Sequence, residues 1–90
     1  MLTHSQTSDK LKIIMYTTKW CPDCWRAKRV MDSMGVAYDE VNISHDLDAQ
    51  AIVERINRGN HSVPTLIFPD GSTLTEPRTA ELSAKLSALM

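Results

Sequence analysis

The sequence has few cysteines, no excess of charge of either sign and no long hydrophobic run. Only two of its 90 residues are cysteine, too few for a secreted domain held together by several disulfides. The formal net charge is −1, with acidic and basic residues interspersed, so there is no electrostatic footprint for nucleic acid or an anionic membrane surface. No apolar run approaches the length that a bilayer requires. We therefore expect neither nucleic acid nor a membrane among its partners.

The first ten residues lack the apolar stretch of a secretory signal. They are mostly polar, and Leu2 is the one large aliphatic residue after Met1. We expect residues 1–10 to form a flexible tail and residues 11–90 to form one domain, since a chain of this length has room for a single core. The domain is expected to act in the cytoplasm as a monomer.

Apolar runs typical of strands alternate with helical patterns along the rest of the chain. The strand-like segments are 11–17, 36–43, 63–68 and 73–75. Helices are predicted from Pro22 to a C-cap at Gly35, from a cap at Ser44 or Asp46 to 59–60, and from Pro77 onward. The order β-α-β-α-β-β-α predicts an α/β fold with a four-stranded mixed sheet flanked by three helices.

The two cysteines stand at the start of the first predicted helix, where residues 21–24 read Cys-Pro-Asp-Cys. Cys21 is expected at or next to the N-cap, where unpaired N–H groups and the positive end of the helix dipole stabilise a thiolate. Cys24 falls one helical turn later and is expected to be the more buried sulfur. An exposed attacking thiolate with a sheltered second thiol suits thiol–disulfide exchange. The pattern therefore predicts Cys21 as nucleophile and Cys24 as the resolving cysteine.

Residues beside the cysteines are candidate contacts for a substrate. Trp20 and Trp25 flank the motif. The two rings form an apolar surface where substrate docks, or they have an ordinary packing role without contact to substrate. Lys19 would add positive charge near the thiolate. Asp23 would raise the pKa of Cys21 relative to an uncharged residue, without reversing the effect of the helix dipole.

A second candidate segment is 61–64, which reads His-Ser-Val-Pro. A proline where a strand begins is usually a bend or edge device, but a cis Pro64 would turn backbone groups toward a bound thiol or extended peptide. His61 either lines that groove or is a solvated loop histidine. None of the histidines has the spacing to complete a zinc site with the two cysteines, so no metal is expected.

Taken together, these residues resemble the glutaredoxin family. The similarity covers nearly all of residues 12–89, and rests on the segments Trp20-Cys21-Pro22-Asp23-Cys24, Arg26-Ala27-Lys28, Val63-Pro64-Thr65 and Asp70-Gly71. Among the branches of the family, the sequence is most similar to the mycoredoxins, the glutaredoxin-like reductases of actinobacteria. That similarity rests on Tyr16-Thr17-Thr18, Gly59-Asn60 and residues 70–75.

The resemblance implies a thioredoxin-like fold, a nucleophilic Cys21, a resolving Cys24 and a cis Pro64 packed against the active site. It implies reduction of mixed disulfides between client proteins and a low-molecular-weight thiol, which acts as co-substrate, with no metal or organic cofactor. The partners would be that small thiol and S-thiolated proteins. The expected substrate-binding residues are Trp20, Pro22, Asp23, Trp25, His61, Ser62, Val63, Pro64, Thr75 and Glu76.

Two departures from the family pattern bear on which thiol is used. Glutathione-using relatives usually carry a lysine three residues before the nucleophile, where this chain has Thr18. They also carry a Gly-Gly and an Asp before the last helix, where this chain reads Thr75-Glu76-Pro77-Arg78. A carboxylate at Glu76 would disfavour a carboxylate of the thiol unless Arg78 offsets it. We therefore expect mycothiol in preference to glutathione.

Three other functions stay open. A dithiol redoxin charged by thioredoxin reductase, which supplies ribonucleotide reductase, typically has a Trp-Ser-Gly-Phe-Arg-Pro-type segment before the last helix; this chain has neither Trp nor Phe after Phe68. An iron–sulfur carrier would share a cluster between two protomers through Cys21 and external thiols, although Pro22 resembles the redox members more. The third is a binding module whose cysteines are incidental.

Overall fold

Seven elements follow one another in the predicted order in the computed structural model, which describes residues 12–89. They are β1 (Ile13–Thr17), α2 (Pro22–Ser33), β2 (Tyr38–Asn42), α3 (Leu47–Ile56), β3 (Thr65–Ile67), β4 (Thr73–Thr75) and α4 (Thr79–Leu89). The tail expected over residues 1–10 lies outside the described residues, as do Leu11 and Met90.

The four strands form one mixed sheet in the order β2-β1-β3-β4. β1 and β2 are parallel, which is why a helix, α2, must cross between them, whereas β3 pairs antiparallel with both β1 and β4. The short connection from β3 to β4 is the turn expected at residues 69–72. The sequence-based prediction of an α/β fold with a four-stranded mixed sheet and three helices is confirmed.

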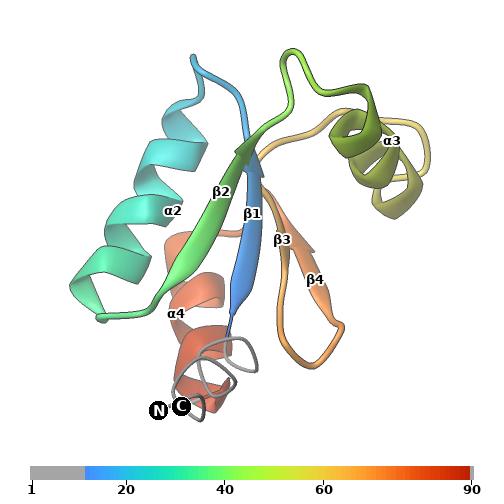
Figure 1. Cartoon of the computed structure of the whole chain (residues 1–90). Helices are drawn as coiled ribbons and strands as arrows, with labels where there is room; N and C mark the ends of the chain where they lie inside the picture. The colour runs from blue at the N-terminus through green and yellow to red at the C-terminus, as the bar shows by residue number, and fades with distance from the viewer. Residues whose placement is uncertain (1–11, 90) are drawn as a thin grey trace, which may run out of the picture.

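Alternating side chains of the strands build one core on each face of the sheet. Ile13 and Met15 of β1 and Leu66 of β3 belong to the cluster that includes residues of α2 and α4. Ile14 and Tyr16 point the other way, into the cluster that contains Ala49 and Val53 of α3, together with their neighbours on the sheet. Helices α2 and α4 therefore cover one face and α3 the opposite face (Figure 1).

Several element boundaries differ from the prediction, among them both ends of β2, which was expected over 36–43. Three other differences have a local reason. Helix α3 ends at Ile56, three residues before Gly59, because Arg58 already adopts a left-handed backbone with φ 56°. Helix α4 begins after Pro77, since the N–H of Leu82 bonds to the carbonyl of Arg78 at 2.9 Å and makes Arg78 the cap. Strand β3 begins at Thr65, because the preceding proline has no N–H for the sheet.

The other predicted helix ends are confirmed, except that the C-cap of α2 is Met34, one residue before the predicted Gly35. Pro22 is the first residue of α2, and Gly35 follows the helix with φ 68°, a conformation that glycine adopts without penalty. Of the two candidate caps for α3, Asp46 takes the role and accepts the N–H of Ala49 at 3.0 Å. Within residues 12–89, no helix combines the length and apolar character needed to span a membrane.

Candidate active site

Cys21 is the N-cap of α2, as the sequence predicts. Its backbone is extended (φ −143°, ψ 92°), and its carbonyl accepts the N–H of Trp25 at 3.1 Å, the first bond of the helix. The N–H of Cys24 donates to the Cys21 sulfur at 3.0 Å. Sulfur thus stands where a capping oxygen usually does, at the positive end of the helix dipole.

The two cysteines form a disulfide, with 5.1 Å between their Cα atoms. Cys24 has no exposed surface, so the prediction that it is the more buried sulfur is confirmed. The prediction of an exposed Cys21 is wrong, because only 6% of that residue is exposed. Its sulfur is enclosed by its disulfide partner, the Cys24 amide and the Val63 carbonyl, whose oxygen lies 3.8 Å away.

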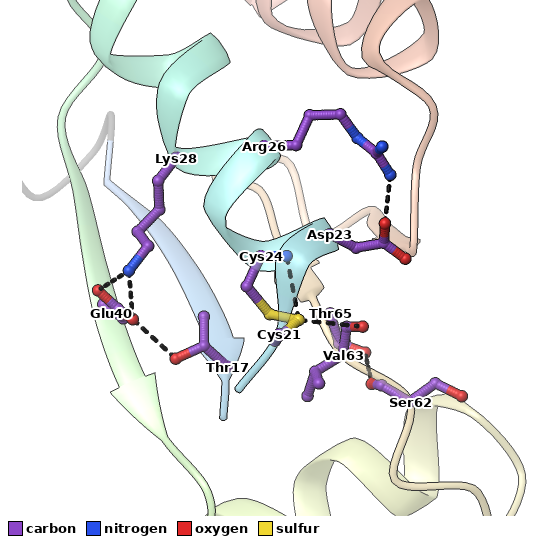
Figure 2. The surroundings of a disulfide bond; sticks show 10 residues. All are labelled: Thr17, Cys21, Asp23, Cys24, Arg26, Lys28, Glu40, Ser62, Val63 and Thr65. Atoms are coloured by element: carbon purple, nitrogen blue, oxygen red, sulfur yellow. Dashed lines mark hydrogen bonds and ion pairs between the residues drawn. A yellow bond between two sulfur atoms is a disulfide. The ribbon is translucent and has the colours of Figure 1, made fainter. Parts of the chain in front are cut away.

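The Val63–Pro64 segment lies directly against this disulfide although it is 42 residues away in sequence (Figure 2). The peptide bond between the two residues is cis, as the family resemblance implied. Pro64 is buried, and its carbonyl accepts the N–H of Glu76 at 2.8 Å. The structure thereby brings Cys21, Val63, Pro64 and Glu76 together, from three separate parts of the chain.

Opposite charges neutralise one another on the first turn of α2. Asp23 forms an ion pair with Arg26, one helical turn later, and Figure 2 shows the two side chains reaching toward each other. Because Arg26 offsets the Asp23 carboxylate, less negative charge opposes a thiolate at Cys21 than the sequence suggested. Lys19 lies over the ring of Trp20, with its ammonium 6.0 Å from the ring centre.

A polar cluster beside the cysteines, made by Thr17, Lys28 and Glu40, is absent from the sequence-based prediction. The buried Thr17 hydroxyl donates to Glu40 at 2.8 Å, and the Lys28 ammonium donates to both oxygens of that carboxylate at 3.0 and 3.2 Å (Figure 2). Burial alone would raise the pKa of Glu40, but these hydrogen bonds and the Lys28 charge outweigh it, so the pKa is lowered. The cluster connects the last residue of β1 to the middle of β2 and of α2.

Other predicted contact residues have different surroundings. Trp20 is 79% exposed and Trp25 is 47% exposed, which leaves both rings open to a partner. His61, by contrast, pairs with Glu54 of α3. The Thr75 hydroxyl donates to Asn57, a residue that the sequence did not single out.

Metal ligands do not converge at this site. In the part of the chain that the structure describes, no group of three or more histidine, cysteine and acidic side chains could hold an ion.

Comparison with known proteins gives a consistent family match. Residues 13–72 match the family model described as Glutaredoxin. A glutaredoxin-like protein of Mycobacterium tuberculosis is 47% identical over 74 residues, which are 82% of this chain and 88% of that protein. Mycoredoxin 1 of Corynebacterium glutamicum is 38% identical over 77 residues, 86% of this chain and 95% of that one. The crystal structure of the glutaredoxin from Methanosarcina mazei matches with a TM-score of 0.72 at 27% identity, covering 86% of this chain and 79% of its own.

Proposed function

The chain belongs to the glutaredoxin family of thiol–disulfide oxidoreductases, and from this premise we propose that Cys21 is the nucleophile that reduces mixed disulfides between client proteins and a low-molecular-weight thiol. The observation that carries the proposal is the hydrogen bond from the Cys24 amide to the Cys21 sulfur at the start of α2. An N–H donor and the helix dipole both favour a negatively charged sulfur, so they lower the pKa of the reduced Cys21 thiol.

The proposed reaction has two exchanges. The Cys21 thiolate attacks the small-thiol sulfur of the mixed disulfide; a Cys21–small-thiol bond forms, and the client cysteine leaves as a thiolate that takes up a proton. A second small thiol then attacks the small-thiol sulfur, releases Cys21 and forms the small-thiol disulfide. Alternatively, Cys24 attacks the Cys21 sulfur, releases the small thiol and leaves the Cys21–Cys24 disulfide. The 5.1 Å Cα separation supports the second route, since it lies within the range that a disulfide requires.

The substrate is proposed to lie along Ser62–Pro64. The Val63 carbonyl is 3.8 Å from the Cys21 sulfur, so an extended thiol or peptide seated on this backbone would present its own sulfur to the nucleophile. Trp20 and Trp25, which flank the Cys21–Cys24 motif in sequence, provide exposed aromatic surface suited to the apolar part of a client protein. These contacts explain how a mostly buried sulfur would select a substrate by shape and orientation.

Mycothiol is proposed as the small thiol in preference to glutathione. Glu76 is exposed and sits next to Pro64 through its backbone hydrogen bond, with φ 48°. Within residues 12–89 its carboxylate has no ion pair, and Arg78 therefore does not neutralise it by contact. A free carboxylate next to Pro64 repels the carboxylates of glutathione. It does not repel mycothiol, because mycothiol has no carboxylate. The 38% identical relative that is named Mycoredoxin 1 supports the same choice.

A coupled assay with one S-thiolated substrate and three reductants tests this choice. We expect kcat/KM to be at least about tenfold higher with mycothiol than with glutathione. Bacillithiol also carries carboxylates, so kcat/KM with bacillithiol should be lower than with mycothiol as well. The Glu76→Gln variant should raise kcat/KM with glutathione about three- to tenfold, because it removes the partly screened repulsion between the Glu76 carboxylate and the carboxylates of glutathione. It should leave kcat/KM with mycothiol within twofold of the wild-type value.

The matched control is Asp32→Asn, which removes an exposed carboxylate near the far end of α2. This variant should leave kcat/KM unchanged with both mycothiol and glutathione. An unchanged preference in Glu76→Gln would contradict the role of Glu76. Better turnover with glutathione by the wild type would contradict the choice of mycothiol. Turnover with thioredoxin reductase and NADPH, without any small thiol, would instead favour the dithiol redoxin.

The proposed place of action is the cytoplasm, with the protein working as a monomer. A reducing compartment keeps closely spaced cysteines available for exchange, whereas an oxidising one would hold them as a structural disulfide.

A further inference from the structure

Asn57 connects three segments that meet behind the proposed substrate-binding backbone. It directly follows α3, and its N–H closes the last turn of that helix on the Val53 carbonyl at 2.9 Å. Its side-chain NH₂ donates to the hydroxyl of Thr65, the first residue of β3, at 3.0 Å. Its side-chain oxygen accepts the hydroxyl of Thr75, the last residue of β4, at 2.6 Å. One side chain therefore joins α3 to the ends of two strands.

The chain of hydrogen bonds continues to the segment that faces the nucleophile. Because the Thr65 oxygen accepts from Asn57, its own proton is directed to the carbonyl of Ser62, 2.8 Å away. Figure 2 shows Ser62, Val63 and Thr65 beside the disulfide, with the bond between Thr65 and Ser62 drawn. The next carbonyl along the chain, that of Val63, is the one 3.8 Å from the Cys21 sulfur. Asn57 is thus two hydrogen bonds away from the backbone that flanks the reacting sulfur.

We propose that Asn57 is a positioning residue for the reaction: through Thr65 it holds the Ser62–Pro64 backbone at the distance from Cys21 that a bound mixed disulfide needs. This inference rests on the proposed function, because it assumes that substrate lies along Ser62–Pro64. Asn57 touches neither the substrate nor the cysteines in this role. Its effect is on where the binding edge lies, and therefore on substrate affinity more than on the chemical step.

The network requires the amide group of asparagine. A donor must face Thr65 and an acceptor must face Thr75, and a short side chain must supply both from one position. An aspartate has nearly the same shape but only acceptors. In Asn57→Asp the Thr65 hydroxyl would turn its proton to the new carboxylate and release the Ser62 carbonyl. The aspartate variant therefore separates the direction of the hydrogen bonds from the packing of the side chain.

The test measures steady-state kinetics of the full chain with an S-thiolated substrate, for Asn57→Asp and Asn57→Ala. We expect KM for the mixed disulfide to rise about fivefold to twentyfold in both, with kcat within twofold, since the loosened backbone binds ground state and transition state less well to the same degree. Dithiothreitol, which is too small to need this edge, should reduce the Cys21–Cys24 disulfide within twofold of the wild-type rate.

The matched control is Asp46→Ala, which removes the N-cap of the same helix and destabilises α3 from its other end. It should lower thermal stability about as much as Asn57→Ala and leave KM within twofold. Thr65→Val breaks the bond to Ser62 directly, so the double variant Asn57→Ala, Thr65→Val should raise KM no further than either single change.

Two results would overturn the proposal. One is a rise in KM no larger in the Asn57 variants than in Asp46→Ala, which would make Asn57 purely structural. The other is additive effects of Asn57→Ala and Thr65→Val. Failure of the proposed function itself would look different, because mixed-disulfide reduction would then survive replacement of Cys21 whatever stands at position 57.

Discussion

The Cys21→Ser variant is expected to reduce mixed disulfides at least about a thousandfold more slowly than the wild type. A serine hydroxyl in the same N-cap position keeps the hydrogen bond from the Cys24 amide but stays protonated at neutral pH and is a poor nucleophile toward sulfur. Since serine is a favoured N-cap residue, the helix should start as before and the variant should fold. The measurement is turnover of an S-thiolated substrate with the small thiol in excess.

Cys24→Ser is the matched comparison, because it makes the same atomic change one helical turn away. It should keep a substantial part of the activity, as a second small thiol can clear Cys21 without Cys24. It should also prevent the intramolecular disulfide. Full activity in Cys21→Ser would show that the mechanism is wrong, and equal losses in both variants would show that Cys24 is required at every turnover.

Leu66→Ala is expected to destabilise the fold strongly. Leu66 lies in β3, has no exposed surface and belongs to the core between the sheet and the helices α2 and α4. Truncating a buried leucine typically costs about 2–5 kcal/mol through lost burial and the cavity that remains. A domain of this size has a free energy of unfolding on the order of 5–13 kcal/mol. The variant should therefore lose about 2–5 kcal/mol of its free energy of unfolding, measured by urea unfolding.

Leu47→Ala provides the control for that experiment. Leu47 is 79% exposed in the first turn of α3, and substitution of an exposed residue usually changes stability by about 0.5 kcal/mol or less. If the two leucine variants unfolded at the same urea concentration, the position of Leu66 in the core would be wrong.

The order of elements could be predicted because each signal is local. Pro22 and Gly35 mark the ends of one helix with their own backbone preferences, and a run of β-formers such as residues 13–17 needs no distant information. The start of α4 differs from the prediction because Pro77 suits a first helical turn in general, whereas here the chain is already fixed by the hydrogen bond between Glu76 and Pro64. A contact between residues 12 positions apart leaves no periodic pattern.

The same distinction separates the predicted and unpredicted parts of the active site. The place of Cys21 at the N-cap followed from its spacing to Pro22 alone. The Thr17, Lys28 and Glu40 cluster required the parallel register of β1 with β2, and the bonds of Asn57 required the pairing of β3 with β4. Composition and spacing do not encode these registers.

The limited exposure of Cys21 escapes sequence-based prediction for a related reason. A helix start predicts a solvent-facing first turn, but the cis segment that packs onto this one comes from 42 residues away. The consequence is a sulfur that is stabilised by one amide and flanked by one carbonyl, with only 6% of its residue exposed. Charge stabilisation from the helix must therefore compensate for burial, which alone would raise the pKa of a thiol.

The measurement that tests the role of the helix start most directly is titration of the Cys21 thiol in Cys24→Ser, followed by the ultraviolet absorbance of the thiolate. We predict a pKa below the value of about 8.5 for a free cysteine, because the helix start stabilises the thiolate. The rate of attack on a disulfide should rise with pH through the pKa of Cys21 and level off above it. A Cys21 thiol that stays protonated until about pH 8.5 or higher would contradict the claim that the start of α2 creates the nucleophile.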